Sequence, residues 1–212
     1  MNRNFFSFTK KSVIFHYDAL IDENNDPVFD SPALRGYMNR WDGNEFLSLL
    51  NADKRKSVLE IGIGTGRLAV RVAPLCGSFT GIDLSPKTAL RARENLSEFD
   101  NVSVICADFE EYEFSQKFDI VYSSLTFMHF YKKKDVVLHI YDILAANGRF
   151  VLSIDKSQEK IIDYGTRKIT VYPDNFKDTE KNLLTAGFLI EKEIETEAAH
   201  IFAAVKKAND HI

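Results

Sequence analysis

The alternation of apolar and polar positions predicts a series of short buried strands separated by amphipathic helices. The strand-like runs cover residues 57–60, 78–82, 102–106, 118–123 and 149–154. Strand, helix and strand in repetition favour a parallel sheet with right-handed crossovers and helices on both faces. The middle of the chain therefore indicates an α/β fold.

The segments between these strands carry helix signals. Helices are predicted over residues 66–73, 85–96 and 133–144. The second of them opens with Ser85 and Pro86, an N-cap followed by proline at the first helical position. The third places its apolar residues on one stripe, and Asn147 and Gly148 follow its end.

The two ends of the chain differ from the middle. Residues 1–52 are rich in aromatic side chains and are expected to form helices or ordered loops. Beyond residue 155 we predict a hairpin turning at 164–167, a helix that starts near Asn175 and closes at Gly187, and an antiparallel pair of edge strands at 189–194 and 200–205. No repeat or low-complexity linker interrupts the chain. We therefore expect a single domain over residues 1–212, made of an N-terminal helical or lid segment (1–52), a ligand-binding core (53–155) and a C-terminal part (156–212).

Composition narrows the class of protein. The 212 residues carry a net charge of −4, so no overall basic field is available to hold a nucleic-acid backbone, and nucleic-acid binding is not expected. Cys76 and Cys106 lie in apolar surroundings without metal-ligand spacing, which predicts buried thiols in a reducing compartment and no metal site. No signal peptide or membrane span is recognisable. A cytoplasmic protein is the expectation.

The strongest chemical signal is a glycine-rich turn after the first strand of the core. Glu60 ends the apolar run, Gly62, Gly64 and Gly66 follow at alternate positions, and apolar residues resume at Leu68. Such a turn brings a ligand directly onto backbone N–H groups at a helix N-terminus.

Two further acids follow the next two strands. Asp83, followed by Leu84, can accept two hydrogen bonds from a ribose diol. Asp108 can take an adenine amino group while Phe109 covers the ring face. Because ligands of open parallel sheets bind at the carboxyl ends of the strands, these side chains would contact successive parts of one adenosyl ligand.

Together these motifs resemble those of the class I S-adenosylmethionine-dependent methyltransferases, and residues 118–124 and 144–152 resemble the family's fourth and fifth strands. The resemblance implies a three-layer αβα, doubly wound, Rossmann-like fold with a seven-stranded, mostly parallel sheet whose last strand is antiparallel. It implies S-adenosylmethionine as the cofactor, with the glycine loop on the methionine part, Asp83 on the ribose and Asp108 on the adenine. The cofactor-binding residues expected on this basis are Tyr17, Glu60, Gly62, Gly64, Gly66, Arg67, Asp83, Leu84, Asp108, Phe109 and Ser123.

Other interpretations of these residues stay open. A dinucleotide site is disfavoured because Arg67 stands where the third glycine of its usual pattern would fall. Gly62 and Gly66 could serve helix–strand packing, and Glu60 could cap the helix instead of ordering the loop or the ligand's ammonium group. Asp108 could be solvated. Arg67 could pair with the methionine carboxylate or face solvent.

The segment after the fourth strand is where the transferable methyl group should point. His129 is the best candidate there for a general base, and Asp155 is a lesser one. The alternative for His129 is a histidine that packs beneath the ligand or caps a helix. Tyr17 and Trp41 are candidates for a lid over the site, or for the core.

Absent motifs bear on the acceptor. The chain lacks the Asn/Asp-Pro-Pro-Tyr sequence of base-amine methylation, the Pro-Cys nucleophile of cytosine-C5 enzymes, the paired glutamates of protein arginine methyltransferases and the acidic metal ligands of catechol-type enzymes. By elimination we expect methyl transfer to a small molecule. A non-catalytic cofactor-binding regulatory protein, or a methyltransferase acting on RNA or protein, stays open, as does homodimer formation.

Overall fold

The computed structural model describes residues 3–208, so the first two and last four residues of the expected single domain lie outside it. Within this range one sheet has seven strands in the order β3-β2-β1-β4-β5-β9-β8. The pairings from β3 to β5 are parallel, and β9 runs antiparallel to both β5 and β8. The strands are β1 (Ser57–Ile61), β2 (Ser78–Asp83), β3 (Val102–Cys106), β4 (Phe118–Ser124), β5 (Leu144–Asp155), β8 (Phe188–Glu195) and β9 (Ala199–Lys206). The predicted mostly parallel sheet with its last strand antiparallel is confirmed.

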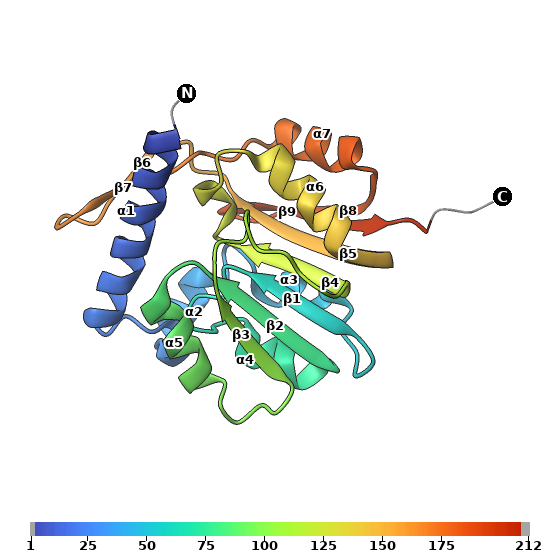
Figure 1. Cartoon of the computed structure of the whole chain (residues 1–212), viewed down its shortest axis with the longest axis horizontal. Helices are drawn as coiled ribbons and strands as arrows, with labels where there is room; N and C mark the ends of the chain where they lie inside the picture. The colour runs from blue at the N-terminus through green and yellow to red at the C-terminus, as the bar shows by residue number, and fades with distance from the viewer. Residues whose placement is uncertain (1–2, 209–212) are drawn as a thin grey trace.

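Helices cover both faces of this sheet, and the two core clusters show which helices share a face (Figure 1). Leu59 and Ile61 of β1 pack with residues of α6 and α7, whereas Val58, one position before Leu59, packs on the opposite face with residues of α3, α4 and α5. The helices are α3 (Gly43–Leu50), α4 (Ala69–Val72), α5 (Pro86–Asn95), α6 (Lys133–Ile143) and α7 (Phe176–Ala186). The three-layer, doubly wound architecture is confirmed.

Several boundaries differ from the predicted ones. The helix expected from residue 66 begins only at Ala69, because Gly66 has a φ of +99° that no right-handed helix accommodates. It continues after Val72 as a 3-10 turn, Ala73–Leu75. Strand β5 begins at Leu144, five residues before the predicted start, because Leu144 pairs with Phe118 before a shift in register. The N-cap of α5 is as predicted, since Ser85 Oγ accepts a hydrogen bond of 3.2 Å from Thr88 N–H.

A cap lies over the carboxyl ends of the strands. It consists of α1 (Arg3–Asp22), α2 (Pro32–Met38) with the short 3-10 turn Pro27–Phe29 before it, and the hairpin of β6 (Ile161–Asp163) and β7 (Lys168–Thr170). Figure 1 shows α1 beside this hairpin at the edge of the molecule. The hairpin turn at 164–167 is as predicted: Tyr164 N–H donates to the Arg167 carbonyl oxygen at 2.9 Å.

Helix α1 is attached on both sides. Arg167 of the hairpin donates from Nε to His16 Nδ1 at 2.9 Å and forms an ion pair with Glu23. At the other side, Asp18 accepts hydrogen bonds from Ser85 Oγ at 2.6 Å and from the Lys87 N–H at 3.1 Å, at the start of α5. Helix α1 is therefore fixed to both the hairpin and the core.

The prediction that both cysteines are buried is wrong for Cys106. Cys76 is 1% exposed in the α4–α5 face of the core, whereas Cys106 is exposed because it ends β3, the edge strand of the sheet. Among the described residues, no three His, Cys, Asp or Glu side chains are grouped to hold a metal ion. No helix in residues 3–208 has the length and apolar character needed to cross a bilayer.

Candidate active site

The three glycines of the turn after β1 have different surroundings. All three have positive φ, at +73° for Gly62, +58° for Gly64 and +99° for Gly66. A Cβ atom on Gly62 would lie 2.1 Å from Thr126 Oγ1, and one on Gly66 would lie 3.3 Å from Leu96, but one on Gly64 would meet nothing within 4 Å. Gly62 and Gly66 thus permit close packing, whereas Gly64 leaves open space at the ligand side of the turn.

Asp83 joins this turn to the end of β2. Its Oδ2 accepts a hydrogen bond of 3.0 Å from Gly64 N–H, and its Oδ1 accepts one of 2.9 Å from Ser85 N–H. Burial raises the pKa of Asp83, and the backbone N–H donors oppose this shift. Each carboxylate oxygen keeps lone pairs for further donors. Asp83 therefore fixes the loop while its carboxylate faces the cavity.

Glu60 is buried, with 4% of its surface exposed. Its Oε2 accepts a hydrogen bond of 2.8 Å from the Tyr122 hydroxyl, and burial raises its pKa to about 8. At neutral pH most of the molecules therefore carry a protonated Glu60. The side chain lines the cavity, so a cation there would stabilise the charged form.

Arg67 does not face solvent. It donates to both carboxylate oxygens of Asp42, at 3.1 Å and 2.5 Å, and the Asp42 side chain is fully buried. Asp42 also accepts a hydrogen bond of 2.8 Å from Ser124 Oγ. Sequence reasoning missed Asp42, because an acid directly before a helix is typical of an N-cap and gives no sign of a partner 25 residues away.

Ser124 lines the cavity in place of Ser123, the residue that the sequence analysis predicted. The Ser123 hydroxyl donates to the Ile61 carbonyl oxygen at 3.1 Å inside the sheet, and Ser123 does not line the cavity. Ser124 does line it. The difference is one position along β4, where successive side chains point to opposite faces.

Asp108 and Phe109 lie at the end of β3. Asp108 is not solvated: it accepts hydrogen bonds from Lys10 Nζ of α1 and from Glu110 N–H, the latter at 3.0 Å. Phe109 is buried and stacks on the His139 ring with 4.7 Å between centroids. Lys10 is a second residue that the sequence did not indicate.

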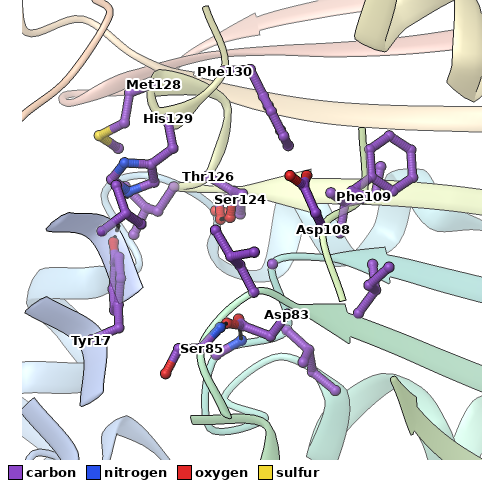
Figure 2. A pocket seen from close by; sticks show the side chains of 18 of the residues that line it. Tyr17, Asp83, Ser85, Asp108, Phe109, Ser124, Thr126, Met128, His129 and Phe130 are labelled. Atoms are coloured by element: carbon purple, nitrogen blue, oxygen red, sulfur yellow. Dashed lines mark hydrogen bonds between the residues drawn. The ribbon is translucent and has the colours of Figure 1, made fainter. Parts of the chain in front are cut away.

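His129 is paired with Tyr17 across the cavity from Asp108 and Phe109 (Figure 2). The Tyr17 hydroxyl and His129 Nε2 form a hydrogen bond of 2.8 Å. The other ring nitrogen, Nδ1, is buried and has no hydrogen-bond partner among the described residues. Burial lowers the pKa of His129 to about 4, so the imidazole is neutral at physiological pH.

One cavity of about 1330 Å³ collects nearly all of the predicted site residues. Gly66 and Ser123 are the two that do not line it. Trp41, Asp155, Tyr164 and Tyr172 line it as well, and Trp41 Nε1 and the Tyr172 hydroxyl are buried without a hydrogen-bond partner in the described part of the chain. The predicted residues that line it are Tyr17, Glu60, Gly62, Gly64, Arg67, Asp83, Leu84, Asp108, Phe109 and His129.

Comparison with known proteins places this arrangement in a class. A family model described as a methyltransferase domain matches residues 58–148, from β1 into β5. Residues 58–148 are thus similar to a methyltransferase domain, and the chain has the fold of solved S-adenosylmethionine-dependent methyltransferases.

Individual relatives share this core. The chain is 32% identical over 114 residues to a malonyl-[acyl-carrier protein] O-methyltransferase of Acetivibrio thermocellus, a match covering 52% of this chain and 40% of that protein. The chain spans about two fifths of the length of the curated relatives that it matches first. Magnesium protoporphyrin IX methyltransferase from Synechocystis, solved with bound S-adenosylmethionine, has a TM-score of 0.74 and 17% identity over 94% of this chain and 97% of that one. The N-methyltransferase NodS from Bradyrhizobium japonicum, solved with S-adenosylhomocysteine, has a TM-score of 0.70 and 15% identity over 94% and 100%.

Proposed function

We propose that this protein transfers a methyl group from S-adenosylmethionine to a small-molecule acceptor. The observation that carries the proposal is the convergence of Gly64, Asp83 and Asp108 on one cavity, at the carboxyl ends of three neighbouring strands. These are the groups that the methionine part, the ribose and the adenine of the cofactor require.

The residues present fit the cofactor. The open space at Gly64 admits a ligand onto the backbone, and the buried Thr65 Oγ1 beside it has no hydrogen-bond partner among the described residues. Asp83 offers lone pairs on both oxygens to a ribose diol. Asp108 would accept a hydrogen bond from the adenine amino group. Lys10 Nζ, which now donates to Asp108, would either keep its hydrogen bond beside the adenine or be displaced by it.

Two more residues complete the proposed cofactor end. Glu60, neutral when the site is free of cations, would gain charge beside the methionine ammonium group. Leu84 lies next to Asp83, where it would contact the nucleoside. Both terminal nitrogens of Arg67 already donate to Asp42, which also accepts from Ser124 Oγ. Arg67 is therefore expected to influence the cofactor indirectly, by fixing Asp42 and Ser124.

The bound sulfonium supplies an electrophilic methyl group, so the protein's task is to align the acceptor and to exclude water. Helix α1 and the β6–β7 hairpin cover the carboxyl ends of the strands for this purpose. His129 reaches a bound acceptor through the Tyr17 hydroxyl, because Tyr17 occupies Nε2.

The size and the covering of the cavity support a small acceptor. About 1330 Å³ exceeds the usual range of small-molecule sites, roughly 300–1,000 Å³, and so has room for the cofactor and a second compact molecule. The names of the relatives do not select the atom that is methylated, since both O-methyltransferases and an N-methyltransferase occur among them.

The proposal is tested by turnover. The purified protein is incubated with S-adenosylmethionine and a panel of small acceptors, and release of S-adenosylhomocysteine is measured against an Asp83→Ala control. Acceptor-dependent release that the control lacks supports the enzyme. Cofactor binding at micromolar concentration without release for any acceptor, including RNA and protein extracts, would contradict it and favour a cofactor-binding regulatory protein.

A further inference from the structure

The end of the cavity away from the adenine-binding residues has its own chemistry. His129 follows β4, Asp155 is the last residue of β5, and Tyr172 N–H donates to the Met128 carbonyl oxygen at 2.7 Å, next to His129. We call this region the acceptor end. Its residues are Tyr17, Trp41, His129, Asp155, Tyr164 and Tyr172.

Aromatic rings make up most of the acceptor end. Trp41 is held at the end of β5, because its carbonyl oxygen accepts a hydrogen bond from Ser153 Oγ. Tyr164 and Tyr17 both contact the buried His16 ring, with centroid distances of 4.2 Å and 4.9 Å. The guanidinium groups of Arg40 and Arg167 already lie against the Trp41 and Tyr164 rings, 5.1 Å and 5.7 Å from the ring centroids. These rings therefore offer a ligand mainly apolar surface.

Asp155 is the carboxylate of this region. It is half-buried, and its Oδ1 accepts a hydrogen bond of 2.7 Å from Ser157 N–H. Among the described residues, no Lys, Arg or His lies within ion-pair distance of it. A cationic ligand group could therefore pair with Asp155 without displacing a protein cation.

The Lys and Arg side chains that line the cavity either form ion pairs with the protein or are exposed to solvent. Lys10 is bound to Asp108 and Glu110 at the adenine end, and Arg67 is bound to Asp42. Lys11 and Lys132 are exposed to solvent. An anionic acceptor would therefore meet the Asp155 carboxylate, and among the described cations that line the cavity the exposed Lys11 and Lys132 would have to offset its charge.

From this distribution of charge we propose that the acceptor is an amine carried on a ring-sized apolar group, held by Asp155 and the aromatic side chains of the acceptor end. This inference rests on the proposed methyl transfer and names its substrate class. Asp155 would receive the ammonium form by a charge-assisted hydrogen bond, and the rings would pack against the apolar group.

The weak basicity of the Tyr17–His129 pair is consistent with an amine. Hydroxyl and carbon acceptors usually need a base to become nucleophiles, and a histidine with a pKa of about 4 is a poor one. An amine needs only to lose its ammonium proton to solvent. Its nitrogen lone pair then forms the N–CH₃ bond while the C–S bond breaks and its electron pair stays on sulfur, and the methylated nitrogen carries the positive charge.

The experiment compares matched probes. Arylalkylamines, such as 2-phenylethylamine and tryptamine, and carboxylates of similar size, such as 3-phenylpropionate and indole-3-propionate, are titrated into the protein saturated with S-adenosylhomocysteine, and their affinities are measured by calorimetry. The same titrations use Asp155→Asn and, as a matched control, Asp100→Asn. Asp100 is exposed in the turn before β3, at the opposite end of the sheet.

We expect at least one amine to bind about tenfold or more tightly than its matched carboxylate, and Asp155→Asn to remove that preference. Asp100→Asn should keep the preference for the amine, and neither substitution should change the affinity for S-adenosylhomocysteine. Preference for the carboxylates, equal or absent binding of both classes, or an unchanged preference in Asp155→Asn would overturn the inference. If the unmodified protein does not bind S-adenosylhomocysteine at all, the proposed function itself is contradicted.

Discussion

The hydroxyl of Tyr17, in the N-terminal helix, lies 2.8 Å from Nε2 of His129, 112 residues further along the chain. This contact brings the cap into the site, because Tyr17 belongs to α1 and His129 to the segment that follows β4. Helix α1 is in turn fixed by Arg167 and by Asp18, so the position of the Tyr17 hydroxyl depends on the whole cap.

Replacing Tyr17 by phenylalanine tests whether this pair acts in the reaction. We expect kcat to fall about tenfold, the worth of one hydrogen bond of roughly 1.4 kcal/mol in the transition state. Cofactor affinity should stay within twofold, because Asp83 and the glycine turn are untouched. Steady-state kinetics with calorimetry separates the two effects. An unchanged kcat would show that Tyr17 serves only the packing of α1.

Two alanine substitutions separate the roles of the glycines. Gly64→Ala should cost only about 1–2 kcal/mol of stability, the price of a Cβ at positive φ with open space around it, yet it should weaken cofactor binding by more than tenfold. Gly62→Ala should destabilise the protein further, by about 3 kcal/mol or more, because its Cβ overlaps Thr126. Denaturant unfolding and calorimetry measure both quantities. Equal stability loss in the two variants would contradict this division.

Glu60 should couple cofactor binding to pH. Its pKa of about 8 leaves it mostly protonated at pH 7, and a positively charged ligand nearby lowers that pKa, so binding should release a proton and tighten as pH rises from 6 to 8. Calorimetry at pH 7 in buffers of different ionisation enthalpy counts the protons. Glu60→Gln should abolish the release. Proton uptake, or release that persists in this variant, would rule out the role of Glu60.

The same shift has a consequence for the stability of the ligand-free protein. Because the folded pKa of Glu60 lies above its ordinary value of 4.5, the folded state binds the extra proton between these values. The contribution of Glu60 to stability is present below pH 4.5 and is lost as pH rises towards 8. Unfolding free energies measured across this range should fall less steeply in Glu60→Gln than in the unmodified protein.

The buried pair of Arg67 and Asp42 should be sensitive to the loss of one partner. Asp42→Asn leaves the guanidinium without its carboxylate and should lower the free energy of unfolding by about 3 kcal/mol. Arg91→Gln provides a control, since its pair with Asp26 is more exposed and should cost about 1 kcal/mol or less. Similar losses in the two variants, by denaturant titration, would contradict the structural role of Asp42.

The sequence predicted what depends on local pattern. The alternation of strands and helices, the glycine turn and the acids Asp83 and Asp108 follow from residues that are close together in the chain, and the sheet order confirms the fold class. The error at the first helix of the core has a local cause, a glycine at positive φ. The error at Cys106 arises from the order of the strands, which places β3 at the edge of the sheet.

The partners of those residues could not be predicted. Lys10 reaches Asp108 and Tyr17 reaches His129 only because the cap folds back over the sheet, and Asp42 reaches Arg67 only because α3 packs on the sheet. No periodicity or spacing in the chain records these contacts. The sequence therefore indicated which side chains line the cavity more completely than it indicated their partners.

The measurement that tests the central claim most directly is calorimetric titration of S-adenosylmethionine into the unmodified protein and into Asp83→Ala. We expect micromolar binding by the unmodified protein and a loss of about 100-fold or more in the variant, because the carboxylate that accepts from Gly64 N–H is also the group proposed to bind the ribose diol. Circular dichroism confirms that the variant is folded. Affinity that is absent in the unmodified protein, or unchanged in a folded Asp83→Ala, would contradict the assignment of this cavity.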